Sequence, residues 1–138
     1  PNLVNYIADK GHTVASHGYH HRSLMFASRR NVLEDMIRAN EIIKYDKNGI
    51  TPVLFRPPYG RIGIGVWQAA RQLGMKIVLW SLSPADYRIQ PTDSIVQHVI
   101  DRVRPGDIIL LHERRRTIEA IKPMIDGLRD KGLEPKAL

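Results

Sequence analysis

Residues 75–82 have the sequence M-K-I-V-L-W-S-L, which is apolar at nearly every position. A strand of a parallel sheet is covered on both faces and carries such a continuous apolar run, whereas a half-exposed strand alternates. Residues 107–111, D-I-I-L-L, repeat the pattern after the turn at Pro105-Gly106. Both segments are therefore predicted to be buried strands of a parallel sheet.

Segments with helical periodicity alternate with these strands. The expected helices cover residues 3–8, 66–73, 92–103 and 117–131, with a longer one that Ser28 caps and Asn48-Gly49 ends. Shorter strands are expected at residues 13–16, 53–55 and 133–138. Pro123 fits the last helix only in or near its first turn. Strands and helices that alternate through short turns imply right-handed crossovers, so the fold class is α/β with a parallel sheet.

Length and composition predict one domain over residues 1–138, with 43% apolar residues available for a core. No apolar run approaches the roughly 18 residues of a membrane span. Because the chain has no cysteine, a metal site would need histidine, aspartate or glutamate. The net charge of +7 permits an anionic polymer as partner, but Arg114–Arg116 is a short basic run without interleaved aromatics, so nucleic acid is not expected. The chain begins with Pro1 rather than Met, which indicates a processed or partial polypeptide.

Side chains that can bind metal, carry charge or transfer a proton follow four of the predicted strands. In parallel α/β folds, sites form beyond the carboxyl ends of the strands. His17 follows residues 13–16, Arg56 follows residues 53–55, Asp86 lies just past residues 75–82, and His112 follows residues 107–111. We expect these four side chains to converge on one face.

Each candidate also has a plainer interpretation. His17 and His21, four residues apart, could aim both imidazoles at one metal ion, or they could be incidental in a polar turn. The loop F-R-P-P-Y-G, residues 55–60, could hold the Tyr59 amide rigidly, or could be an ordinary turn. His112 could transfer a proton near neutral pH with Asp86 holding it protonated, or could be a core histidine bonded to a backbone carbonyl.

Taken in order, four motifs resemble those of the polysaccharide deacetylase family, the NodB homology domain or carbohydrate esterase family 4. They are H-G-Y-H-H (17–21), R-P-P-Y-G (56–60), S-P-A-D-Y (83–87) and L-L-H (110–112). The resemblance covers nearly the whole chain. It implies a parallel-strand (β/α) barrel of the NodB type, distorted and here partial because the first strands are missing.

The resemblance also implies a role for each site residue. His17 and His21 would be ligands of zinc or another divalent metal, Tyr59 would offer its backbone N–H to the oxyanion, Arg56 would orient the catalytic aspartate, and Asp86 would tune His112, the general acid. Leu110, Tyr87 and Pro58 would line the substrate pocket, with Leu110 against the acetyl methyl group.

Some positions depart from the family pattern. Gly18 stands in place of Ser or Thr, Ser83 in place of the first aspartate of its motif, and Tyr87 in place of tryptophan. The family's first motif, T-F-D-D, which supplies the base and the third metal ligand, does not occur in the sequence. We therefore expect this chain alone to bind metal weakly and to be inactive, and an exposed sheet edge to favour self-association.

The implied function is a metal-dependent deacetylase that hydrolyses acetyl groups from N-acetylated or O-acetylated glycans such as chitin or peptidoglycan. Water would be activated at a His/His/Asp metal site. The family resemblance implies an extracellular, periplasmic or cell-envelope location. Two alternatives stay open: a catalytically inactive glycan-binding relative or truncated fragment, and a basic protein that binds anionic polymers.

Overall fold

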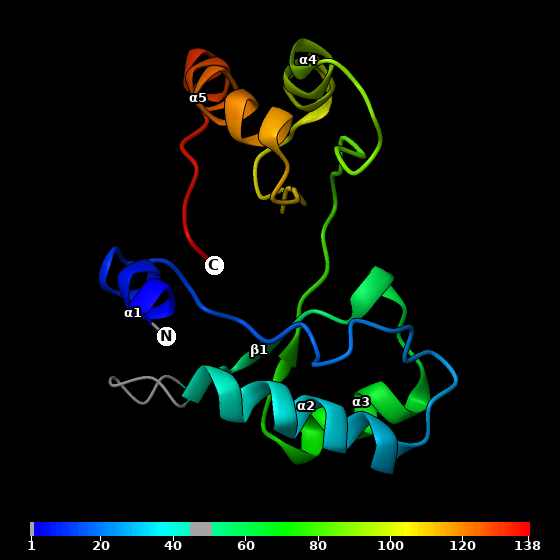
Figure 1. Cartoon of the computed structure of the whole chain (residues 1–138). Helices are drawn as coiled ribbons and strands as arrows, with labels where there is room; N and C mark the ends of the chain where they lie inside the picture. The colour runs from blue at the N-terminus through cyan, green and yellow to red at the C-terminus, as the bar shows by residue number, and fades with distance from the viewer. Residues whose placement is uncertain (1, 45–50) are drawn as a thin grey trace. The chain divides into compact units, whose positions relative to one another are not determined.

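The computed structural model describes residues 2–44 and 51–138 (Figure 1). The described part divides into two compact units. The first unit comprises the described residues up to Leu79 together with Ala137–Leu138, and the second unit comprises Trp80–Lys136. No helix within the described residues is both long enough and apolar enough to cross a membrane. The single domain expected from the chain length remains a prediction.

The first unit has a parallel α/β arrangement. Its elements are α1 (Asn2–Asp9), α2 (Arg29–Lys44), β1 (Leu54–Phe55), the short 3-10 helix η1 (Pro58–Gly60), α3 (Ile64–Gln72) and β2 (Lys76–Ile77). Strands β1 and β2 pair in parallel, with Phe55 opposite Ile77, and Ser16 forms a parallel bridge to Phe55 on the other side. Helices α2 and α3 lie side by side (Figure 1). Their inner faces bury Val32, Met36 and Val66 around the fully buried Phe55.

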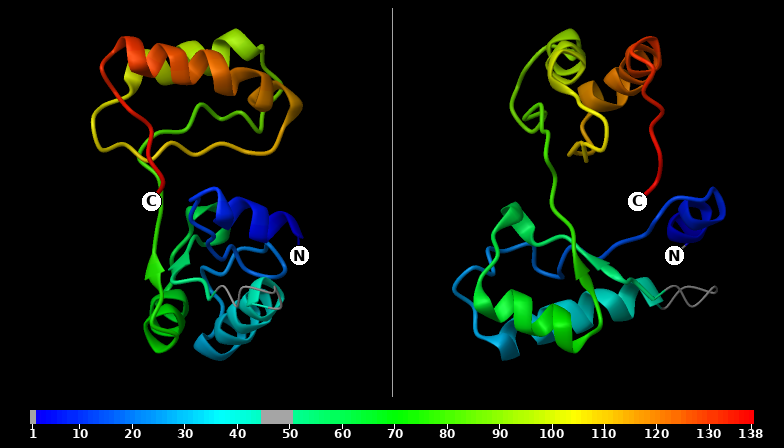
Figure 2. Two further views of the ribbon diagram at one scale, coloured as in Figure 1. Left: turned by 90° about the vertical axis from the view of Figure 1, so that its left-hand side faces the viewer. Right: turned by 180° about the vertical axis from the view of Figure 1, so that it is seen from behind.

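The second unit is built around two helices, α4 (Thr92–Arg102) and α5 (Arg115–Asp130), which pack against each other (Figure 2, right view). Leu82 and Ile109 form a parallel bridge beneath them. The core of this unit consists of Leu82, Ile95, Val99, Ala120, Met124 and Leu128. The apolar side chains of α4 and α5 therefore form a continuous apolar face on each helix, as the periodicity predicted.

The predicted strands are shorter than expected. Of residues 75–82 only Lys76–Ile77 form a strand, with Leu82 in a single bridge, and Lys76, Leu79 and Ser81 are exposed. Residues 107–111 contribute one bridge at Ile109 and are half-buried, residues 13–16 contribute only Ser16, and residues 133–138 form no strand. The prediction that the two apolar runs are strands covered on both faces was wrong for this chain. A strand needs hydrogen bonds to a neighbouring strand, and in the first unit the bonds between β1 and β2 end at Val78.

The helix boundaries agree closely with the sequence pattern. Ser28 precedes α2, and its hydroxyl accepts a hydrogen bond from the Asn31 N–H at 3.3 Å. The predicted end of that helix at Asn48-Gly49 lies outside the described residues. Gly74 ends α3 at φ 65°, with the Met75 N–H bonded to the Ala70 carbonyl, as in a Schellman motif. Gly132 ends α5 in the same way.

Pro123 lies two turns inside α5, which begins at Arg115. The expectation that Pro123 lies in or near the first turn was wrong. A proline there has no N–H to donate to the Glu119 carbonyl, which weakens the helix locally. The buried residues Ala120 and Met124 flank this point, and their packing stabilises the helix on either side of the proline.

Gly63, just before α3, lies close to the backbone of Met25, which leaves no room for a side chain. A Cβ at Gly63 would lie 1.9 Å from the Met25 carbonyl oxygen. We expect Gly63→Ala to lower the free energy of unfolding by about 3 kcal/mol or more, since the backbone must move to relieve the clash. Gly74→Ala is the control, because its Cβ meets nothing within 4 Å and only the positive φ costs about 1–2 kcal/mol. Urea unfolding followed by circular dichroism measures both, and equal losses would contradict the prediction.

Candidate active site

The first group of candidate residues is the loop after Ser16, which carries the two histidines. The ring centroids of His17 and His21 are 5.0 Å apart with their planes at 68°, and both residues are exposed. Two imidazoles on one tetrahedral zinc ion, with Zn–N of about 2.0–2.1 Å, have ring centres about 5 Å apart. The pair therefore fits two ligands of one metal ion.

The orientation of His17 is fixed through its second nitrogen. His17 Nδ1 lies 2.6 Å from the Arg56 carbonyl oxygen, which can only accept. Nδ1 therefore carries the proton and donates it, so in this tautomer the ring lone pair is on Nε2. A histidine whose other nitrogen donates to a carbonyl is the usual arrangement of a metal ligand.

His21 and Tyr59 hold each other in unusual backbone conformations. Their rings lie 5.2 Å apart, and the Tyr59 hydroxyl donates to the His21 carbonyl oxygen at 3.4 Å. His21 has φ 48° and Tyr59 has φ 60°, which places both in the left-handed region that disfavours non-glycine residues. Each such residue costs on the order of 1 kcal/mol or more and persists only where its surroundings enforce it, often at functional sites.

Arg56 follows β1 and lies close to the same loop. Its Nη2 donates to the Leu79 carbonyl oxygen at 3.3 Å, whereas its Nε is buried and has no partner within the described residues. Burial lowers the pKa of Arg56. A half-buried guanidinium with a buried Nε donor that has no partner among the described residues is suited to pairing with a carboxylate. Pro58, in the same loop, is fully buried and fixes its backbone.

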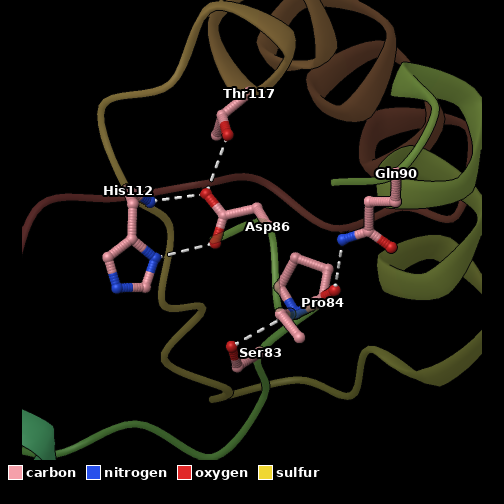
Figure 3. Close-up of polar contacts among 7 residues, drawn as sticks. Ser83, Pro84, Asp86, Gln90, His112 and Thr117 are labelled. Atoms are coloured by element: carbon pink, nitrogen blue, oxygen red, sulfur yellow. Dashed lines mark hydrogen bonds and ion pairs between the residues drawn. The ribbon is translucent and has the colours of Figure 1, made fainter. Parts of the chain in front are cut away.

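The second group is centred on Asp86, in the second unit (Figure 3). Asp86 is 3% exposed and accepts three hydrogen bonds. Its Oδ1 lies 2.8 Å from His112 Nδ1, and its Oδ2 accepts from the His112 N–H at 2.6 Å and from the Thr117 hydroxyl at 2.8 Å. The carboxylate therefore fixes both the backbone and the ring of His112, whose side chain is 41% exposed.

These hydrogen bonds determine the charge of Asp86. Burial, the largest single influence, acts to raise the pKa of Asp86. The hydrogen bonds from the His112 ring, the His112 N–H and the Thr117 hydroxyl act together in the opposite direction, and the net effect lowers the pKa. Asp86 is thus an ionised acceptor that holds the proton of His112 on Nδ1 and leaves Nε2 directed away from it.

The turn before Asp86 is held by side chains as well. The Ser83 hydroxyl accepts a hydrogen bond from the Ala85 N–H at 3.2 Å, and Gln90 donates to the Pro84 carbonyl oxygen at 2.8 Å (Figure 3). Ala85 has φ 54°, a conformation that this bonding supports. Ser83, which replaces the first aspartate of the motif, therefore shapes the turn that presents Asp86.

The pocket residues expected in the second unit lie close to this cluster. The Tyr87 ring is 5.5 Å from the His112 ring, at 77°, and Tyr87 is 52% exposed. Leu110 is half-buried, and its N–H donates to the Leu82 carbonyl oxygen. Both residues therefore stand beside His112 at the ends of the paired segments around Leu82 and Ile109.

The structure brings the predicted site residues together in two groups. His17, His21, Arg56, Pro58 and Tyr59 belong to the first unit, and Asp86, Tyr87, Leu110 and His112 to the second. Their convergence on one face remains a prediction. Within residues 2–44 and 51–138, no cluster of three histidine, aspartate or glutamate side chains is placed to hold a metal ion.

Two residues that sequence reasoning missed contact the candidate site. Thr117 donates to Asp86, and Asp35 of α2 accepts the N–H groups of Tyr19 and His20. Both lie in helices, where a lone polar residue is normally solvent-facing. Their burial, 2% exposed for Thr117 and 4% for Asp35, becomes evident only in the folded chain.

The chain is similar to proteins of known family. A family model for polysaccharide deacetylases matches residues 1–78. The chain is 31% identical to a peptidoglycan-N-acetylglucosamine deacetylase of Bacillus cereus, over 96% of this chain and 64% of that protein. It is also 31% identical to a chitooligosaccharide deacetylase of Sinorhizobium fredii, over 100% of this chain and 71% of that protein.

Solved structures give the same result. A family 4 carbohydrate esterase from Streptomyces lividans, in complex with acetate, matches with a TM-score of 0.88 at 32% identity, over 96% of this chain and 69% of that one. A pseudoenzyme of the same esterase family from Bacillus anthracis matches with a TM-score of 0.89 at 26% identity, over 96% and 47%. The α/β fold class of the NodB type is thus confirmed. This chain belongs to the polysaccharide deacetylase family.

Proposed function

We propose that the protein is a metal-dependent deacetylase that hydrolyses acetyl groups from N-acetylated or O-acetylated glycans. The observation that carries this proposal is the His17–His21 pair, with ring centroids 5.0 Å apart and His17 Nδ1 bonded to the Arg56 carbonyl. The named relatives act on peptidoglycan N-acetylglucosamine and on chitooligosaccharides, which supports polymers of N-acetylglucosamine as the substrate class.

The residues around the pair fit a divalent cation, zinc foremost. Nε2 of His17 and a ring nitrogen of His21 would hold it, with a third ligand from outside the described residues. When bound, such an ion polarises the substrate carbonyl and lowers the pKa of a coordinated water. Arg56, whose buried Nε has no partner in the described part of the chain, would orient a carboxylate base. The Tyr59 backbone N–H, on the rigid loop after Pro58, would stabilise the oxyanion.

His112 would protonate the leaving amine or alcohol. Asp86 supports this role, because it is ionised and bonded to His112 Nδ1, which fixes the ring and leaves Nε2 for proton transfer. Leu110 would contact the acetyl methyl group, and the half-exposed ring of Tyr87 would contact the sugar.

The proposal is tested by acetate release from the full-length protein. We expect zinc-dependent acetate release from acetylated chitooligosaccharides or from peptidoglycan, which a chelator abolishes and added zinc restores. An O-acetylated xylan in parallel distinguishes amide from ester hydrolysis. A protein that binds zinc stoichiometrically and releases no acetate from any of these glycans would refute the proposal.

The second candidate is a catalytically inactive glycan-binding protein. The match to the Bacillus anthracis pseudoenzyme favours it, because a chain of this fold can lack activity. Isothermal titration calorimetry with chitooligosaccharides separates the two functions. Saturable binding of the acetylated oligomer without acetate release would establish the binding protein.

A further inference from the structure

We propose that Asp35, in α2, is a positioning residue that holds the His17–His21 loop in the shape needed for both imidazoles to bind one metal ion. This inference rests on the proposed function, because it concerns the same metal site. Asp35 is far from the loop in sequence and belongs to none of the four motifs.

The contacts of Asp35 are with the two backbone amides between the histidines. Oδ2 accepts the Tyr19 N–H at 2.9 Å, and Oδ1 accepts the His20 N–H at 3.2 Å. A carboxylate that accepts backbone N–H groups forms charge-assisted hydrogen bonds, which are stronger than neutral ones. Each oxygen therefore fixes one peptide of the short segment that joins His17 to His21.

Among the described residues, no ion pair explains the burial of the Asp35 carboxylate. Asp35 is 4% exposed, and no lysine or arginine in the described part of the chain forms an ion pair with it. A buried charge is costly unless it is paired or hydrogen-bonded. The loop amides supply that stabilisation, so the carboxylate and the loop depend on each other.

Two neighbouring residues strengthen this attachment. Gly18 has φ 79°, and a Cβ there would lie 2.8 Å from Asp35 Oδ2, so the absence of a side chain lets the carboxylate reach the amides. Arg38, one turn further along α2, places its guanidinium 3.9 Å from the centre of the Tyr19 ring. Helix α2 therefore holds Tyr19 at both its backbone and its ring.

Without Asp35, the Tyr19 and His20 amides would lose their acceptors and the loop would gain conformational freedom. The 5.0 Å spacing of the two rings would then no longer be enforced. Groups that orient metal ligands from behind typically contribute about 10–100-fold in metal affinity. We expect a loss of this size for zinc, because the imidazoles themselves remain.

The test is Asp35→Asn in the full-length protein, with zinc affinity measured by competition against a chromophoric chelator. We expect the zinc dissociation constant to rise about 10–100-fold. Activity should fall at limiting zinc and recover at saturating zinc, which a general folding defect would not produce. Asparagine is nearly isosteric, but it presents an NH₂ group to one of the two N–H donors. Asp35→Glu, which keeps the carboxylate, should recover part of the affinity.

Glu34→Gln is the matched control, because Glu34 neighbours Asp35 on α2 but is exposed and pairs with Arg30 at the surface at 2.9 Å. Hydrogen exchange of the Tyr19 and His20 amides provides a readout that needs no metal, and both should exchange faster in Asp35→Asn. Zinc affinity and amide exchange within twofold of the Glu34→Gln control would overturn the inference. Wild-type protein that binds zinc but releases no acetate would refute the proposed function alone.

Discussion

Replacing His17 with alanine in the full-length protein is expected to abolish stoichiometric zinc binding and to lower kcat/KM for acetate release by about 10³-fold or more. The magnitude follows from the several kcal/mol of transition-state stabilisation that a metal Lewis acid supplies, at about 1.4 kcal/mol for each factor of ten. His17 is the better anchored member of the pair, because its Nδ1 bond to the Arg56 carbonyl fixes the ring. His21→Ala should have the same effect, since the proposed function makes both rings ligands of one ion.

The loop provides its own control for this experiment. His20 lies between the two candidate ligands, yet its ring packs against Tyr19, with centroids 4.8 Å apart, and not against His17 or His21. His20→Ala should therefore leave zinc affinity and kcat/KM within a few-fold of wild type. Isothermal titration calorimetry gives the zinc stoichiometry of each variant. If His20→Ala lost zinc while His17→Ala kept it, the assignment of the ligands would be wrong.

The sequence predicted the helices well because helical periodicity is local. The apolar positions of α4 and α5 that define the expected helices, such as Ile95, Val99 and Met124, are the ones that pack in the second unit. The lengths of the strands were overestimated, because strand formation depends on residues that are distant in sequence. Residues 75–82 are apolar enough for a long strand, but a strand forms only where a neighbour supplies hydrogen bonds, and that neighbour is remote in sequence.

Some features of the candidate site can likewise be predicted from the sequence and others cannot. The spacing of His17 and His21, and the positions of Asp86 and His112 after apolar segments, are visible in the sequence. The strained backbones of His21, Tyr59 and Ala85 are not, because none of these positions carries the glycine that normally marks a left-handed conformation.

Asp35 and Thr117 were likewise hidden from sequence reasoning. Each is an unremarkable polar residue of a helix until tertiary packing buries it against a loop from another part of the chain. The sequence thus indicates His17, His21, Asp86 and His112, whereas Asp35 and Thr117 are recognised only from the folded structure.

The second large effect is expected at the Asp86–His112 pair. His112→Ala should lower kcat by about 10²–10⁴-fold, the contribution of a positioned general acid, while zinc stoichiometry stays unchanged. Asp86→Asn should also lower kcat, because an amide in place of the carboxylate no longer fixes the His112 proton on Nδ1 by a charge-assisted bond. Acetate release at saturating glycan measures both. Loss of zinc binding in His112→Ala would place His112 among the ligands instead.

Asp86→Asn also has a pH signature in stability. The pKa of Asp86 is lowered in the folded protein below its ordinary value of 3.8, so folding favours the ionised form. The resulting stabilisation is present in full above that ordinary value and is lost as the pH falls through the folded-state pKa. Wild type should therefore exceed Asp86→Asn in free energy of unfolding at neutral pH, and the difference should shrink as the pH falls below about 4.

Asp126→Asn is the control for this comparison, because Asp126 is exposed and pairs with Lys122 at the surface at 2.6 Å. Such pairs contribute about 0–1 kcal/mol, so little change is expected at either pH. Urea unfolding from pH 7 down to pH 2 gives the two curves. A difference between wild type and Asp86→Asn that stayed constant over this range would mean that the carboxylate contributes by packing alone, and the charge-based orientation of His112 would have to be abandoned.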